Sequence, residues 1–158
     1  MHDSATKEWF VRSVQEMRHA MFRVAYAILG NEKDCEDAAA SAILLAYRKL
    51  EQLSDRRRFN AWLMRILRNA CFDILRSRRD DAELKEELAA PEPGYGELYQ
   101  AIRRLKEEPR TCVVLYYLEG YRVAEISGIM DIPAGTVKSH LFRARAELKQ
   151  ALGEEDGA

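Results

Sequence analysis

Apolar residues recur at helical spacing through the first half of the chain. A first helix is predicted over residues 4–29, where one face carries Phe10, Val14, Met17, Met21, Val24 and Ile28. A second helix is predicted over residues 34–53. A third is predicted over residues 59–79, where one face carries Phe59, Leu63, Ile66, Ala70 and Ile74. Because these apolar faces are wide, the three helices can bury a common core.

The composition changes after the third helix. Residues 80–97 hold seven acidic residues and one Lys, and residues 89–96 hold two Pro and two Gly, which oppose a packed helix. Helical spacing returns over residues 97–106 and 109–118. We therefore expect an all-α fold of two small helical domains. They occupy residues 1–80 and 97–152, with a flexible acidic linker at 81–96 and a short tail at 153–158.

Residues 121–152 predict two helices joined by a tight turn, and this is the most informative segment of the chain. Asp131 tolerates the left-handed conformation of such a turn, and Pro133 fits the start of a new helix. The second helix, over residues 134–151, has one narrow apolar stripe, made of Val137, Leu141, Ala144 and Leu148. Away from that stripe project Lys138, Ser139, Phe142, Arg145 and Lys149. Such a helix suits the major groove of DNA, and the alternative is an ordinary helical hairpin with a solvated charged face.

The distribution of charge fits a DNA-binding role better than the net charge, which is only −1. Eight Arg and a single acidic residue, Asp73, lie between residues 56 and 79. A chain that is neutral overall can therefore carry a separate basic patch.

Several other classes of protein find no support. Cys35, Cys71 and Cys112 are far apart in the sequence, so we expect buried reduced thiols rather than a redox switch, and no metal site. No cofactor is implied, and neither paired carboxylates nor a nucleophile motif or phosphate loop indicates an enzyme. No apolar run approaches the roughly 18 residues that span a membrane, and the N-terminus lacks a signal-peptide hydrophobic region. We expect a cytoplasmic protein.

Three ordered stretches carry a resemblance to a known family. They read AYAILGNEKDCEDAAASAILLAYRKL, RFNAWLMRILRNACFDILRSRR and EEPRTCVVLYYLEGYRVAEISGIMDIPAGTVKSHLFRARAELK. In the second stretch the family's spacing is matched by Phe59, Trp62, Leu63, Ile66, Asn69, Asp73 and Arg76. The chain thus resembles the extracytoplasmic-function (ECF) sigma factors, the smallest class of the sigma-70 family of bacterial transcription initiation factors. The resemblance implies a helical sigma region 2, a linker and a helix-turn-helix sigma region 4. It also implies a protein without covalent chemistry, which recruits core RNA polymerase to a promoter, reads two DNA elements and helps to open the duplex.

The chain departs from the family pattern at a few positions. Ala40 and Ser41 stand where the family usually has a Gln-Glu or Gln-Asp pair, on the surface expected to bind core polymerase. Asp131 replaces the usual Gly of the turn, which is a mild change because Asp can adopt the same conformation. His140 stands where the family often has Arg.

The resemblance implies that the helix over residues 134–151 reads a minus-35 element in duplex DNA. The candidate contacts are Arg122, Thr136, Lys138, Ser139, Phe142, Arg143 and Arg145. Lys138, Arg143 and Arg145 would bind phosphates or guanine edges, and Phe142 would meet a thymine methyl. Two alternatives stay open: Phe142 packs on a neighbouring helix, and Thr136 caps the helix instead of holding a phosphate.

A minus-10 element would be read partly as a single strand, by the loop before the third helix and one face of that helix. The candidates are Asp55, Arg56, Arg57, Arg58, Asn60, Arg65, Arg68 and Asn69. Asn60 and Asn69 could read base edges, and the arginines would form a basic track. The alternative is a solvated basic face. Trp62 could support a flipped base, but we interpret it first as a core residue, and Phe59 likewise.

The second helix would bind core polymerase, by family analogy through a coiled coil of the largest core subunit. The candidates are Asp34, Glu36, Asp37, Ile43, Leu44 and Tyr47. The three carboxylates suit a basic partner, although their simpler role is to complement the positive end of the helix. The family also implies an anti-sigma factor that covers both DNA-binding domains.

Two hypotheses from other classes compete with this interpretation. A stand-alone helix-turn-helix regulator explains residues 121–152 equally well but leaves the basic cluster of the first domain unexplained. An adaptor or anti-factor would bind proteins through its helices and would bind no DNA.

Overall fold

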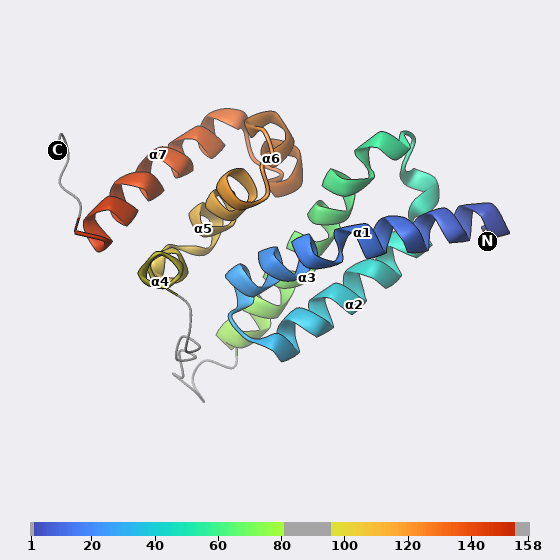
Figure 1. Cartoon of the computed structure of the whole chain (residues 1–158), viewed down its shortest axis with the longest axis horizontal. Helices are drawn as coiled ribbons and strands as arrows, with labels where there is room; N and C mark the ends of the chain where they lie inside the picture. The colour runs from blue at the N-terminus through green and yellow to red at the C-terminus, as the bar shows by residue number, and fades with distance from the viewer. Residues whose placement is uncertain (1, 81–95, 154–158) are drawn as a thin grey trace.

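The computed structural model of the chain describes residues 2–80 and 96–153, and every regular element in these ranges is helical, as the sequence predicts. The N-terminal unit contains α1 (Ser4–Leu29), α2 (Glu32–Arg48), the 3-10 turns η1 (Leu50–Gln52) and η2 (Arg56–Arg58), and α3 (Phe59–Asp80). The C-terminal unit contains α4 (Glu97–Arg104), α5 (Glu107–Val113), the π-helical turn η3 (Val114–Leu118), α6 (Val123–Met130) and α7 (Ala134–Ala151). Figure 1 shows the two units side by side. The predicted linker, except for Gly96, lies outside the described residues.

Local side-chain chemistry sets the helix ends. Asp3 caps α1 by accepting a hydrogen bond from the Thr6 backbone N–H (2.7 Å), and Gly30 ends α1 in the left-handed region at φ 81°. Asn31 caps α2 by accepting from the Asp34 N–H (2.9 Å), so this helix begins two residues earlier than predicted. It also ends earlier than predicted, because the chain tightens into η1. The predicted helix over residues 109–118 is divided into α5 and η3.

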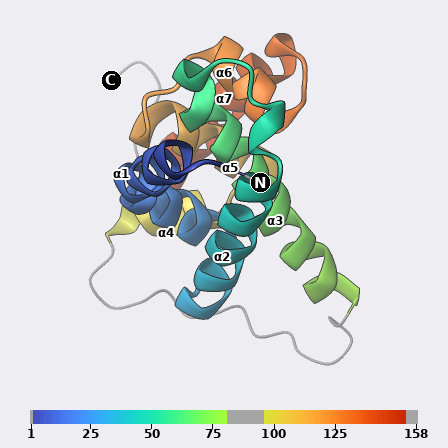
Figure 2. The same cartoon turned by 90° about the vertical axis from the view of Figure 1, so that its right-hand side faces the viewer.

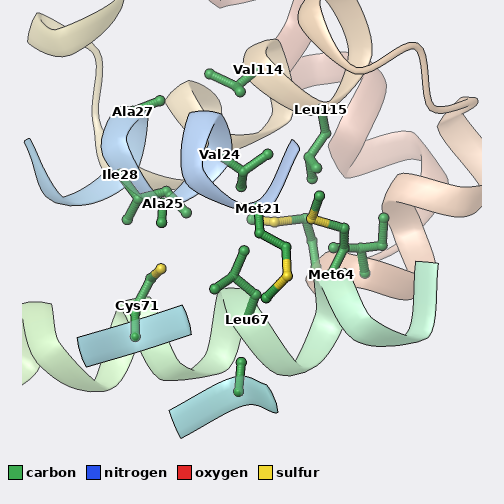
Figure 3. Packing of buried hydrophobic residues seen from close by; sticks show 14 of the residues in the cluster. Met21, Val24, Ala25, Ala27, Ile28, Met64, Leu67, Cys71, Val114 and Leu115 are labelled. Carbon is green, nitrogen blue, oxygen red and sulfur yellow. The ribbon is translucent and has the colours of Figure 1, made fainter. Parts of the chain in front are cut away.

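The hydrophobic core is shared by both units. Met21 and Val24 of α1 lie between Leu67 of α3 on one side and Val114 and Leu115 of η3 on the other (Figure 3). All five side chains are at most 2% exposed. Burying one such side chain stabilises a fold by roughly 1.5–3 kcal/mol. Because these side chains come from both units, their burial holds the two units together as one packed body.

Two arginines of the C-terminal unit bind the carboxyl end of α1, where the last carbonyls of a helix lack helical partners. Arg103 donates from Nη1 to the carbonyls of Ala27 (2.7 Å) and Ile28 (3.1 Å). Arg110 donates from Nη2 to the Ile28 carbonyl (2.8 Å). A Cβ on Gly30 would lie 2.3 Å from Arg103 Nη2, so the guanidinium needs a glycine there.

A third arginine completes this contact from within the N-terminal unit. Arg78 of α3 donates to the Leu29 carbonyl (3.0 Å) and pairs with Asp34 of α2. We call Arg78, Arg103 and Arg110 the arginine clamp. Burial, followed by the neighbouring charge of Arg103, lowers the pKa of Arg110 to about 10, so Arg110 remains charged at neutral pH. Three cations thus meet the negative end of the α1 dipole.

Replacing Arg110 tests the arginine clamp. Arg110→Ala removes hydrogen bonds to the carbonyls of Ile28, Arg103 and Leu105, and leaves these buried acceptors without that donor. We expect the free energy of unfolding to fall by about 3 kcal/mol, measured by urea denaturation. Arg104→Ala, at an exposed position of α4, is the matched control and should change it by less than about 0.5 kcal/mol. Equal losses in the two variants would contradict this role of Arg110.

Candidate nucleic-acid interface

The turn between α6 and α7 has the geometry that the sequence predicts. Asp131 is left-handed at φ 57°, the one non-glycine residue with positive φ in the described ranges. Its N–H donates to the Ser127 carbonyl, and the Ile132 N–H donates to the same carbonyl (3.2 Å). The Ser127 hydroxyl donates back to the Ile132 carbonyl. These bonds fix the direction in which α7 leaves α6.

The two faces of α7 divide as predicted. Val137, Leu141 and Ala144 are buried against the rest of the unit, and Leu148 is partly buried at the end of the same stripe. Phe142 is 75% exposed, which excludes the alternative that it packs on a neighbouring helix in this arrangement. Around it the exposed face carries Lys138, Ser139, Arg143 and Arg145. We call this set, with Phe142, the α7 face.

Two more minus-35 candidates lie at helix starts. Arg122 is exposed at the N-cap of α6, where its backbone N–H donates to the Glu125 carboxylate (3.0 Å). Thr136 is half-buried in the first turn of α7, and its backbone N–H donates to the Pro133 carbonyl (3.0 Å). The residue that caps α7 is Pro133 rather than Thr136, so the structure does not assign the capping role to the threonine.

Tyr117 of η3 holds Arg145, a contact that the sequence does not indicate. The Arg145 Nε donates to the Tyr117 hydroxyl (2.9 Å), and the guanidinium carbon lies 5.8 Å from the ring centroid. The π-helical turn places this ring beside α7, and no periodicity in the sequence predicts such a turn.

The minus-10 candidates in the loop before α3 are held in place by contacts with nearby side chains and backbone. Asp55 caps η2 by accepting from the Arg57 N–H (3.0 Å) and also binds the Arg57 guanidinium, and these bonds lower the pKa of Asp55. Arg56 stacks on Trp9 of α1, with its guanidinium carbon 4.4 Å from the ring centroid. Arg58 is exposed. The loop therefore presents a rigid basic edge.

Two candidates further along α3 are bound to each other. The Arg68 guanidinium lies 4.2 Å from the centre of the Phe72 ring and donates to the Asn69 side-chain oxygen (3.0 Å). Burial lowers the pKa of Arg68. Arg68 is therefore half-buried rather than freely solvated, whereas Asn69 is exposed.

A cleft of about 690 Å³ lies between the two units. Asn60 and Trp62 line it from the N-terminal unit, and Tyr121 and Glu125 line it from the C-terminal unit. Trp62 is only partly buried, so it belongs to both the core and the cleft, whereas Phe59 is 2% exposed and is a core residue as interpreted.

Arg65 crosses this cleft. Its Nη1 donates to the Gly128 carbonyl of α6 (3.2 Å), and its Nη2 lies 3.7 Å from Oδ2 of Asp131. Figure 2 shows α6 and the start of α3 at the same end of the molecule, and the two helices contact each other.

The candidates for polymerase binding on α2 form two groups: some side chains are exposed, and others are paired or packed within the fold. Asp34 is paired with Arg78, and Ile43 and Tyr47 pack against the core, whereas Leu44 is 52% exposed. Glu36 and Asp37 are exposed as well. Leu45, 38% exposed, extends this surface beside Leu44, and sequence reasoning missed it.

Other kinds of site find no support in the described ranges. No group of three or more potential metal ligands occurs among these residues, and none of their helices is long and apolar enough to cross a membrane. Cys35, Cys71 and Cys112 are buried and free, as predicted, and burial raises the pKa of each thiol to about 12. Such thiols react poorly.

Comparison with known families agrees with this geometry. Residues 14–80 match the model for Sigma-70 region 2, and residues 95–148 match the model for Sigma-70, region 4. The first match covers most of α1 to α3, and the second covers α4 to most of α7.

Similar proteins match over nearly the whole chain. The ECF RNA polymerase sigma factor SigW of Bacillus subtilis is 29% identical, over 90% of this chain and 88% of the relative. SigM of Mycobacterium tuberculosis is 29% identical, over 96% of this chain and 81% of the relative. The fold also resembles the sigma factor RpoE of Bartonella quintana, solved in complex with the anti-sigma factor NepR. That likeness has a TM-score of 0.80 at 24% identity, over 91% of this chain and 96% of that one. The two region matches, in this order, and these relatives show that the chain belongs to the ECF sigma factors of the sigma-70 family.

Proposed function

We propose that this sigma factor binds core RNA polymerase, recognises a minus-35 and a minus-10 promoter element, and promotes melting of the duplex. The observation that carries the proposal is the α7 face, where Phe142 is 75% exposed among basic and hydroxyl side chains. An exposed aromatic ring can contact a thymine methyl in the major groove while the basic side chains around it contact phosphates. The covalent chemistry belongs to the polymerase, and the factor would act in the cytoplasm, where that enzyme works.

The minus-35 element would be bound in the major groove by α7. Lys138, Arg143 and Arg145 supply positive charge for phosphates or guanine edges, and Ser139 supplies a hydroxyl. Phe142 would contact a thymine methyl. Arg122 and the backbone near Thr136 would hold the phosphates on either side, since both lie at helix starts.

The minus-10 element would be bound as a separated strand along η2 and the start of α3. Arg56, Arg57 and Arg58 form the basic edge for the backbone, and the strand would continue past Arg65, Arg68 and Asn69. Asn60 and Trp62 line the cleft in which an unstacked base could sit, so they would read or support that base. Asp55 would act indirectly, by fixing the loop.

The partners would be core polymerase, on the exposed surface of α2, and an anti-sigma factor. On α2, Glu36 and Asp37 would meet a basic partner and Leu44 would add apolar contact, while Ile43 and Tyr47 support the helix from below. Asp34 serves the fold through Arg78. An anti-sigma factor is proposed because the solved RpoE structure contains one, NepR. Residues 1–80 and 97–152 are the proposed domains for these tasks.

Transcription with purified components tests the function. The chain plus core polymerase should give specific run-off transcripts from a library of promoters of its source genome, and the chain alone should bind duplex DNA weakly. Specific duplex binding without core would favour a stand-alone regulator. If neither transcripts nor DNA binding appeared, an adaptor or anti-factor would be favoured.

Two substitutions on α7 separate base reading from phosphate binding. Phe142→Ala should change base preference at one position of the minus-35 element and leave thermal stability unchanged, because the ring is exposed. Lys138→Ala should weaken binding to all DNA sequences about equally. It should also lower the slope of log affinity against log salt concentration by about 1. Transcription from a set of minus-35 variants decides between these outcomes. An unchanged base preference in Phe142→Ala would refute the proposed contact.

Two substitutions on α3 test strand opening. Arg65→Ala and Arg68→Ala should reduce initiation, and templates pre-melted at the minus-10 element should restore part of it, because pre-melting supplies the free energy of opening that the lost strand contacts no longer provide. Arg12→Ala, at an exposed position of α1, is the control. If pre-melted templates rescued neither variant, these arginines would have another role.

A further inference from the structure

Arg145 of α7 is held by a neutral group, unlike several other arginines on the surface. Those that pair with carboxylates, so that each pair is electrically neutral, include Arg23, Arg57, Arg76 and Arg79. Arg145 instead donates from Nε to the Tyr117 hydroxyl (2.9 Å), and Nη2 donates to the same oxygen. A tyrosine hydroxyl is uncharged at neutral pH. The pair therefore keeps the whole positive charge of the guanidinium, which an anion can still use.

The hydroxyl occupies one edge of the Arg145 guanidinium. A guanidinium carries five N–H groups in one fixed plane. Because Nε and Nη2 both direct an N–H at the Tyr117 oxygen, the other edge, formed by Nη1 and the second N–H of Nη2, is turned away from the tyrosine. Two N–H groups on one edge suit two oxygens of a phosphate.

The π-helical turn η3 fixes the tyrosine beside α7. Its first two side chains, Val114 and Leu115, are buried, whereas Tyr117 is 50% exposed. The Glu119 N–H donates to the Val114 carbonyl (3.1 Å), five residues earlier, and such turns are frequent at functional sites. The Tyr117 ring also lies edge to face with the Tyr116 ring, with centroids 4.9 Å apart. Both ends of η3 thus restrain the ring that holds Arg145.

The position of Arg145 on α7 suits a phosphate better than a base. Arg145 lies one turn after Phe142 and two turns after Lys138, so the three share the α7 face. In a helix-turn-helix the first residues of the second helix contact base edges. Arg145 belongs to the later half of α7, and Tyr117 lies outside both helices of the motif. The backbone of the DNA is therefore the nearer target for this pair.

We propose that Tyr117 is a positioning residue for DNA binding, which holds Arg145 so that the outer edge of its guanidinium binds one phosphate of the minus-35 element. The inference rests on the proposed function of the α7 face. Ordering an arginine during binding costs side-chain entropy, and a contact already made in the free protein removes that cost from the binding step. Tyr117 would thus raise affinity through Arg145, without contacting a base.

Four variants separate the hydroxyl from the ring that carries it. Tyr117→Phe removes the hydroxyl and keeps the ring that packs on Tyr116. Tyr116→Phe, the matched control, removes a hydroxyl from the neighbouring ring and leaves the one that binds Arg145. Arg145→Ala and the double variant Tyr117→Phe with Arg145→Ala complete a double-mutant cycle. Because these positions are exposed or half-exposed, the thermal stability of all four variants should equal that of the unaltered chain.

The first measurement is the affinity of the chain with core polymerase for a promoter duplex that the run-off library identifies. Tyr117→Phe should weaken binding about fivefold and Arg145→Ala about tenfold, whereas Tyr116→Phe should leave it unchanged. The double variant should bind as well as Arg145→Ala, because the hydroxyl acts through the guanidinium. A further fivefold loss in the double variant would overturn the inference, since the hydroxyl would then act without Arg145.

The second measurement locates the phosphate. Each phosphate of the minus-35 region is replaced in turn by an uncharged methylphosphonate. At one position the unaltered chain should lose about tenfold in affinity, Tyr117→Phe only about twofold, and Arg145→Ala nothing, while losses at other positions stay equal. A full tenfold loss in Tyr117→Phe at that position would overturn the inference, because Arg145 would bind the phosphate unaided. A changed base preference in Tyr117→Phe would overturn it as well, since the guanidinium would then read a guanine.

The unaltered chain keeps the two proposals apart. If, with core, it binds the promoter duplex no better than DNA of another sequence, the proposed function fails. If it binds the promoter specifically and Tyr117→Phe behaves like Tyr116→Phe, the inference about Tyr117 fails alone.

Discussion

The carboxyl end of α1 is the constraint on which the arrangement of this molecule depends. A helix that ends inside a protein must find donors for its last carbonyls, because buried acceptors without partners are costly. Here the donors are guanidinium groups, one from α3 and two from the C-terminal unit. A lysine could not serve in the same way, since the planar fork of an arginine reaches several acceptors at once. The same contact that completes α1 therefore places α4 and α5, and through them the rest of the helix-turn-helix unit.

Much of this fold follows from local patterns in the sequence. The bounds of α7, its buried stripe and the exposure of Phe142 follow from helical spacing alone, because one side of that helix packs and the other does not. The left-handed turn at Asp131 follows from residue chemistry. The roles of the α7 residues in DNA binding stay predictions.

Contacts between residues that are distant in the sequence could not be predicted in this way. Arg65, Arg103 and Arg110 look alike in a sequence, yet one spans a cleft and two bind a helix end. From the sequence, Asp34 is a candidate for an acidic surface that binds core polymerase, but in the structure its carboxylate is paired with Arg78. In each case the partner is more than 40 positions away, with a separation of 44 for Arg78 and Asp34 and 82 for Arg110 and Ile28, and no periodicity encodes such a pairing.

The turn residue Asp131 links two properties that are usually independent. Gly, Asn and Asp can all occupy its left-handed conformation, so the shape of the helix-turn-helix tolerates any of them. Only Asp also brings a negative charge to within 3.7 Å of Arg65. A single nucleotide change in the codon for this residue can therefore alter the attraction between the two halves of the molecule while α6 and α7 keep their relative orientation.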